Sequence, residues 1–153
     1  MPVKESIHVI IHSSSKFNIK AAKGRGAWAS TFKGNVTLED YFKDSVVYLY
    51  FTKYNTGIFY GVAKMAGVPN IPPEKGLWKE DKYGMMFKIH WINAQREIEI
   101  PGSVGEILDT KIMDEEMGKC LLKQFAGNLG DADINKYLGI DGITKYFGAK
   151  KKQ

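Results

Sequence analysis

The chain has 153 residues, a net charge of +5 and 44% hydrophobic residues at a mean hydropathy of −0.28, values typical of one globular domain rather than a disordered chain. No stretch approaches the ~18 apolar residues of a membrane span, and the N-terminus lacks the apolar region of a signal peptide. The single Cys120 excludes an internal disulfide and a cysteine-type zinc site. We therefore expect an intracellular protein without membrane contact, in which residues 1–153 form one domain with a basic mobile tail near 149–153.

The first third of the chain alternates strand and helix signals. Residues 7–11 are apolar and β-branched, which predicts a buried strand. The serines at 13–15 are helix caps for a helix that runs through Lys23 and ends at Gly24 and Gly26. A short strand is expected over 27–31.

The middle of the chain is richer in strands. Thr37 is the expected cap of a helix over 38–43, and the turn residues at 55–57 separate two β-rich segments, 46–52 and 59–66, which predicts a hairpin. After an irregular, proline-containing loop, 86–92 and 97–100 are the last expected strands.

The C-terminal part of the chain becomes helical from Asp114. Met117, Leu121, Leu122 and Phe125 fall on one helical face before Gly127, and a second short helix is expected near 133–138. The order of elements predicts an α+β domain built on a curved sheet or small barrel flanked by helices.

Basic charge gathers at the two ends of the chain. The first 35 residues hold six basic side chains and one acid, and the nine residues from Lys145 onward hold four lysines and no acid. If the ends meet in the fold, they form a positive face suited to a polyanion. A solvated lysine surface explains the same pattern.

Catalytic and metal-binding patterns are weak. His8 and His12 would lie about 13 Å apart on a strand, too far to share an ion. The sequence Gly24-Arg25-Gly26 follows a helix, whereas a phosphate-binding loop precedes one. We expect no metal, no cofactor and no enzymatic activity.

Three aromatic residues lie outside any core periodicity. Trp28 follows a basic helix, and Trp78 and Tyr83 lie in a polar, lysine-containing loop, whereas Trp91 alternates like a core strand residue. Aromatic rings among lysines suit base stacking. From spacing alone, packing in the core is an equal alternative.

The chain resembles the YTH domain, the reader of N6-methyladenosine, over residues 6–127. The resemblance rests on a W-x-S-T-x-x-G-N pattern from Trp28 to Asn35, and on the segments 47–51, 57–63 and 78–92 in the same order and spacing. It implies a YTH-like, PUA-related fold and a site for a methylated base.

The resemblance also implies residue roles. Trp28, Trp78 and Tyr83 would form an aromatic cage around the methylated base. The Asn18 side chain, the Ser14 backbone N–H and the Ala29 carbonyl would contact the edge of the base. Beside the cage, the charge pattern predicts phosphate contacts from Lys16, Lys20, Lys23, Arg25 and Lys33.

Two positions depart from the family. Leu108 stands where the family has a phosphate-gripping arginine, and His12 aligns with its usual lysine. Three hypotheses follow: a reader of N6-methyladenine in RNA, which is favoured; a reader of flipped N6-methyladenine in duplex DNA, like the N-terminal domain of McrBC-type restriction systems; and a protein-interaction module that binds no methylated base. In each case the chain is expected to act within a longer protein or complex.

Overall fold

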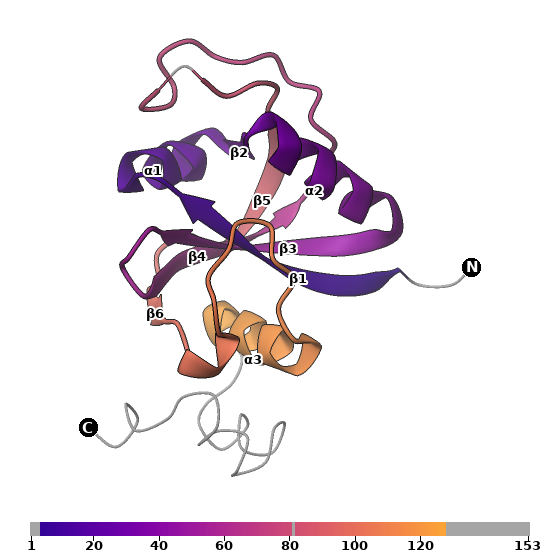
Figure 1. Cartoon of the computed structure of the whole chain (residues 1–153), viewed down its shortest axis with the longest axis vertical. Helices are drawn as coiled ribbons and strands as arrows, with labels where there is room; N and C mark the ends of the chain where they lie inside the picture. The colour runs from indigo at the N-terminus through magenta and orange to yellow at the C-terminus, as the bar shows by residue number, and fades with distance from the viewer. Residues whose placement is uncertain (1–3, 81, 128–153) are drawn as a thin grey trace.

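The computed structural model describes residues 4–80 and 82–127 (Figure 1). Within these residues one mixed sheet is combined with three α-helices. The elements in chain order are β1 (Glu5–Ser13), α1 (Lys16–Arg25), β2 (Ala27–Trp28), α2 (Phe32–Asp44), β3 (Ser45–Lys53), β4 (Ile58–Met65), β5 (Phe87–Asn93), β6 (Ile98–Glu99), a 3-10 turn (Gly102–Val104) and α3 (Glu115–Ala126). The predicted α+β class is confirmed.

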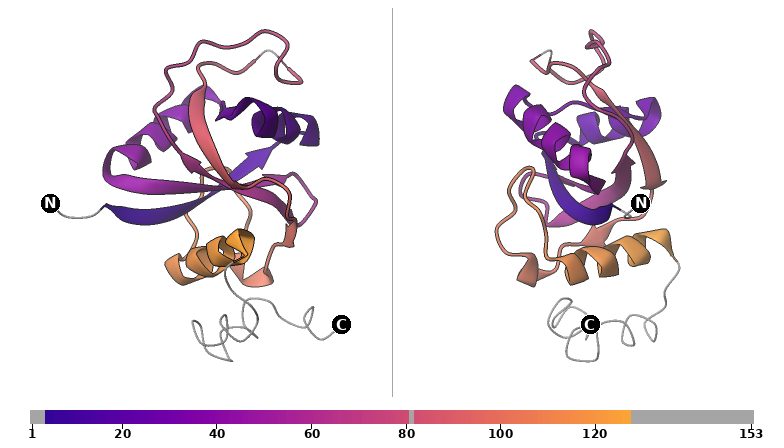
Figure 2. Two further views of the ribbon diagram at one scale, coloured as in Figure 1. Left: turned by 180° about the vertical axis from the view of Figure 1, so that it is seen from behind. Right: turned by 90° about the vertical axis from the view of Figure 1, so that its right-hand side faces the viewer.

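The sheet has the strand order β1-β3-β4-β5-β2, with β6 paired to β4. β1 and β3 are parallel, and the other pairs are antiparallel. No ladder joins β1 to β2 in the described part of the chain, so the strands form an open curved sheet (Figure 2).

Helices cover both faces of the sheet. Along β1, Val9 and Ile11 belong to a core shared with residues of α1 and α2, whereas Ile10 belongs to a second core shared with α3. This alternation follows from the two-residue period of a strand. Figure 1 shows the result, with α1 and α2 on one side of the strands and α3 on the other.

The first helix begins where the sequence predicts. Ser15 is the N-cap of α1, and its side chain accepts the backbone N–H of Asn18. Gly26 ends the helix in the left-handed conformation at φ 71°, whereas Gly24 lies inside the helix rather than ending it. The strand expected over 27–31 is limited to Ala27–Trp28.

The prediction for the second helix is wrong at its start. Thr31, not Thr37, is the N-cap of α2, and its hydroxyl accepts the backbone N–H of Gly34. Thr37 is an internal residue whose hydroxyl donates to the Lys33 carbonyl. A threonine hydroxyl can bond to the preceding turn of a helix, so Thr37 is compatible with the helix interior and need not mark a helix start.

The hairpin and the third helix are confirmed. β3 and β4 pair antiparallel around a turn in which Asn55 and Gly57 have positive φ values of 64° and 69°. Asp114 caps α3 and Gly127 ends it. The helix expected at 133–138 and the tail at 149–153 lie outside the described residues. No helix in the described part of the chain is long and apolar enough to cross a membrane.

Candidate nucleic-acid interface

A long loop between β4 and β5, residues 72–85, carries two of the three predicted cage aromatics. At its base, Ile71 and Met86 exchange backbone hydrogen bonds of 2.9 and 2.7 Å. Glu74 pairs with Arg25 at the end of α1. The Lys79 backbone N–H donates to the Asn18 side chain at 2.7 Å. These contacts hold the loop over α1, as Figure 1 shows.

The two predicted cage tryptophans contact each other. The Trp28 and Trp78 rings meet edge to face, with centroids 5.4 Å apart and planes at 72°. Both are buried, at 5% and 6% exposed, in the core that α1 and α2 cover. Trp28 also packs on Phe51 at 5.1 Å. The fold therefore brings together two residues that are 50 positions apart, and it buries both.

The indole nitrogens distinguish this pair from an ordinary core contact. Among the described residues, the Nε1 atoms of Trp28 and Trp78 are buried and find no hydrogen-bond partner, whereas that of Trp91 donates to the Ala22 carbonyl at 3.0 Å. A buried unsatisfied N–H costs about 1 to 3 kcal/mol. Two such groups on contacting rings indicate that this pair is not optimised for core packing alone.

Tyr83 is half-buried and lies next to Trp78. The two side chains, with Pro73, Glu74 and Lys75, line a cavity of about 310 Å³ that we call the loop cavity. The Lys82 ammonium lies 5.6 Å from the Tyr83 ring centroid. All three predicted cage residues are thus connected through Trp78.

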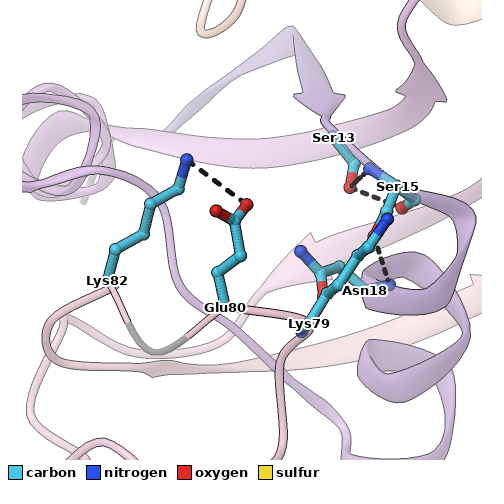
Figure 3. A network of polar contacts seen from close by, with 6 residues as sticks. All are labelled: Ser13, Ser15, Asn18, Lys79, Glu80 and Lys82. Atoms are coloured by element: carbon cyan, nitrogen blue, oxygen red, sulfur yellow. Dashed lines mark hydrogen bonds and ion pairs between the residues drawn. The ribbon is translucent and has the colours of Figure 1, made fainter.

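Asn18 lies in the first turn of α1 and is 2% exposed. Its Oδ1 accepts the Lys79 N–H, which fixes the orientation of the amide, and its own backbone N–H is bonded to Ser15 (Figure 3). The Nδ2 group makes no hydrogen bond within the described residues. Two N–H donors on a positioned amide are therefore free to meet an acceptor.

The two remaining base-edge candidates, Ser14 and Ala29, lie in the segments just before α1 and just after β2. Ala29 follows β2 directly after Trp28 and is buried. Ser14 is exposed and lines a second cavity of about 530 Å³, together with Ser15, Lys16, Phe17, Lys53, Trp78 and Lys79. We call this the lysine cavity. Trp78 lines both cavities.

The predicted phosphate contacts do not form one group. Lys16 lines the lysine cavity, and its ammonium lies 4.9 Å from the Tyr60 ring centroid. Lys20 and Lys33 are exposed on α1 and α2. Burial lowers the pKa of the half-buried Lys23, and nearby Glu97 opposes that shift. Arg25 is committed to Glu74.

Sequence reasoning did not single out Phe17, Lys53 and Lys79, which line the lysine cavity. Lys79 follows Trp78 directly, and Phe17 precedes Asn18, so proximity in sequence was a usable signal for both. Lys53 ends β3, and its place beside α1 follows only from the parallel pairing of β1 with β3, in which Ser13 lies opposite Lys53.

An exposed leucine stands where the family has a phosphate-gripping arginine. Leu108 is 52% exposed. The adjacent Asp109 carboxylate accepts the His12 backbone N–H at 2.8 Å and the Ser30 hydroxyl at 3.4 Å. Asp109 therefore links β1 to the segment after Trp28, while Leu108 supplies no charge.

His8 and His12 have structural contacts. His8 is buried, and its Nδ1 lies 2.8 Å from the Tyr50 hydroxyl, whereas His12 packs edge-on against Tyr54 with centroids 5.0 Å apart. Residues 4–80 and 82–127 hold no cluster of three or more His, Cys, Asp or Glu side chains able to bind a metal. The described residues around the two cavities can therefore stack on a ring, donate hydrogen bonds and attract negative charge.

Comparisons with known proteins agree with this arrangement. The family model for the YT521-B-like domain (YTH) matches residues 6–126. Methylated RNA-binding protein 1 of Saccharomyces cerevisiae is 34% identical over 88 residues, which is 54% of this chain and 29% of that protein, so the chain spans less than a third of its length.

Two solved structures share the fold. The Pho92 YTH domain in complex with m6A superimposes with a TM-score of 0.72 at 26% identity, over 86% of this chain and 90% of that one. The YTH domain of Zygosaccharomyces rouxii MRB1 protein in complex with N6-methyladenosine RNA gives 0.70 at 28% identity, over 82% and 91%. The resemblance read from the sequence is confirmed, and the chain belongs to the YTH domain family.

Proposed function

We propose that this chain is a non-catalytic reader that binds N6-methyladenine in RNA by stacking the methylated base between Trp28, Trp78 and Tyr83. The observation that carries the proposal is the contact between two buried indoles with unpartnered nitrogens, next to an asparagine whose amide is held in one orientation. The two solved relatives in complex with m6A or N6-methyladenosine RNA support the same ligand.

The hydrogen-bonding groups complement the edge of the base. N6-methyladenine offers a ring nitrogen, N1, as an acceptor and keeps one N6–H as a donor. The Asn18 Nδ2 group is a donor, because the Lys79 N–H occupies the oxygen. In the proposed complex Nδ2 donates to N1, the Ala29 carbonyl accepts the N6–H, and the Ser14 N–H donates to another ring nitrogen.

Methyl recognition in such a site relies on stacking and burial. The base is neutral, so its methyl group is held by contact with the rings rather than by cation–π attraction. One methyl group in a fitted apolar site is worth about 1 to 3 kcal/mol, or roughly 10- to 200-fold in affinity.

The two indoles are arranged as adjacent walls rather than as the two sides of a sandwich. Their rings meet edge to face, which leaves no gap for a base between them. Trp28 is held by the β2–β5 ladder and by Phe51, whereas Trp78 lies in the 72–85 loop. In the proposed complex the base therefore lies against this pair, with Tyr83 as the third wall.

RNA is the polymer we favour, because one yeast relative is a methylated RNA-binding protein and the Zygosaccharomyces rouxii domain was solved with N6-methyladenosine RNA. A reader of RNA works inside the cell. Since the curated relative is longer than this chain, the domain would deliver RNA to other parts of a longer protein.

The test is a binding titration with one sequence prepared as single-stranded RNA, single-stranded DNA and duplex DNA, each with and without N6-methyladenine. We expect methylated RNA to bind at least about 10-fold more tightly than its unmethylated match. Removing the 2′-hydroxyl next to the methylated base should weaken binding.

Equal or tighter binding to methylated duplex DNA would replace RNA by a flipped base in DNA as the ligand. Equal binding of methylated and unmethylated strands would overturn methyl reading altogether and leave a protein-interaction module.

A further inference from the structure

An exposed phenylalanine among lysines lies directly beside the proposed base site. Phe17 is 54% exposed and lines the lysine cavity with Lys16, Lys53 and Lys79. Trp78 forms another part of the same wall. Neither composition nor helical periodicity explains this ring, since the buried face of α1 is made by Asn18, Ile19 and Ala22.

We propose that Phe17 is the stacking platform for a nucleotide that flanks the methylated base, with Lys16, Lys53 and Lys79 holding its phosphates. This inference rests on the proposed function and extends it to a second nucleotide. It assigns the lysine cavity as a flanking-nucleotide subsite.

The charges of the cavity favour a strand of nucleic acid as the occupant. Seven described residues line it, of which three are lysines and none is acidic. A positively charged groove with an exposed aromatic ring is the usual means of binding single strands, because the lysines contact phosphates and the ring stacks on a base of any identity. An apolar peptide would leave the lysines without partners.

The position and size of the cavity fit one nucleotide. It shares Trp78 with the loop cavity and includes Ser14, a proposed base-edge residue, so a strand that places its methylated base beside Trp78 can continue across Phe17. Its volume of about 530 Å³ lies within the roughly 300 to 1,000 Å³ of small-ligand sites.

Phe32 is a matched control for Phe17. It is also an exposed phenylalanine in the first turn of a helix, at 84% exposed, yet it is absent from the residues that line the loop cavity and the lysine cavity. Replacing it removes the same ring from another part of the surface.

The experiment is a cycle of protein and RNA changes measured by fluorescence anisotropy. The wild type, Phe17→Ala, Phe17→Leu and Phe32→Ala are titrated with a methylated five-nucleotide RNA. The titration is repeated with RNAs that lack the base on the 5′ or the 3′ side of the methylated position, and with N6-methyladenosine alone by calorimetry. Circular dichroism checks that each variant is folded.

We expect Phe17→Ala to lower the affinity for the intact RNA by about 5- to 150-fold, since one stacked base is worth about 1 to 3 kcal/mol. The loss should disappear for one of the two RNAs that lack a flanking base, and binding of the nucleoside should be unchanged. Phe17→Leu should lose most of the same affinity, and Phe32→Ala should lose none.

The proposal is overturned if Phe17→Ala binds the intact RNA like the wild type, if its loss persists with both flanking bases removed, or if Phe32→Ala loses as much. Failure of the proposed function has a different signature, because then the wild type itself would not distinguish methylated from unmethylated RNA.

Discussion

At the scale of single residues, the burial of the tryptophans changes what their substitution can show. Trp28 and Trp78 are at once core residues and the proposed walls of the base site. Their loop-like sequence context predicts that alanine in either place leaves the fold intact. Because both rings are buried, removing either should instead lower the free energy of unfolding by about 3 to 5 kcal/mol, in addition to weakening the binding of methylated RNA.

Tyr83 therefore gives the cleaner test of the cage. It is half-buried, and its contact with a base would use the ring. Tyr83→Ala should weaken binding of methylated RNA by about 1 to 3 kcal/mol, while Tyr83→Phe should bind almost like the wild type. Isothermal titration calorimetry of both variants measures this. A large loss in the phenylalanine variant would show that the hydroxyl, not the ring, makes the contact.

Asn18 tests the hydrogen-bonding part of the site. In Asn18→Asp one carboxylate oxygen can still accept the Lys79 N–H. The second oxygen takes the place of the Nδ2 donor, so an acceptor would face the N1 acceptor of the base. We expect affinity for methylated RNA to fall by about 1 to 3 kcal/mol at neutral pH. Because Asn18 is buried, the carboxylate should also lower the free energy of unfolding, which urea unfolding measures separately. Unchanged binding by calorimetry would remove Asn18 from the base edge.

At the scale of elements, the ion pair between α1 and the 72–85 loop gives Arg25 two alternative roles, positioning of the loop or contact with a phosphate. Sequence reasoning assigns Arg25 to phosphate, whereas the structure pairs it with Glu74. If Arg25 positions the loop, Arg25→Gln and Glu74→Gln should weaken RNA binding to a similar, small extent, because an exposed ion pair contributes only about 0.2 to 1 kcal/mol. Neither variant should alter the salt dependence of binding.

The competing role predicts a different pattern in the same titrations at several salt concentrations. A phosphate contact through Arg25 would lower the salt slope in Arg25→Gln and leave Glu74→Gln as tight as the wild type or tighter. The double variant completes the cycle, since losses that do not add identify a shared interaction.

The docking of α3 onto the sheet involves a titratable group in the second core. Nδ1 of His8 lies 2.8 Å from the Tyr50 hydroxyl, which donates to the Gly118 carbonyl in α3 at 2.8 Å. Burial, with a smaller contribution from Lys119, lowers the pKa of His8 from 6.5 to about 4, against the opposing effect of Glu115. The buried imidazole is therefore neutral at physiological pH.

This shift predicts a stability that falls with acidification. Between pH 6.5 and 4 the unfolded chain binds a proton that the folded chain does not, so the free energy of unfolding decreases as pH falls through this range. From pH 7 to 5 the loss from His8 should be about 2 kcal/mol. Urea unfolding across this range measures it, and His12→Gln should retain the dependence. A pH-independent stability would contradict the buried, neutral imidazole.

At the scale of the whole molecule, positive charge near the site comes from three separate elements. Lys16 lies in α1, Lys53 at the end of β3 and Lys79 in the 72–85 loop. Lys53→Gln and Lys79→Gln should each lower the salt slope of RNA binding by about 0.7 to 1, whatever the sequence. Lys119→Gln is the control, because α3 covers the opposite face of the sheet (Figure 1). Equal slopes in all three variants would exclude these phosphate contacts.

The sequence by itself was sufficient for features that depend on local chemistry. Ser15 caps α1, Asp114 caps α3, and the turn at 55–57 forms the hairpin, because caps and turns are decided by neighbours within a few residues. The ordered motifs from Trp28 onward identified the family for the same reason, since they are read along the chain.

Only the tertiary structure decided which of those residues meet. The 61 positions between Asn18 and Lys79, and the 49 between Arg25 and Glu74, are bridged by side chains whose proximity depends on how the 72–85 loop folds back over α1. The burial of Trp28 and Trp78 and the gathering of lysines around Phe17 have the same origin. Spacing along a chain carries no information on such contacts, because they are set by the packing of elements that are distant in sequence.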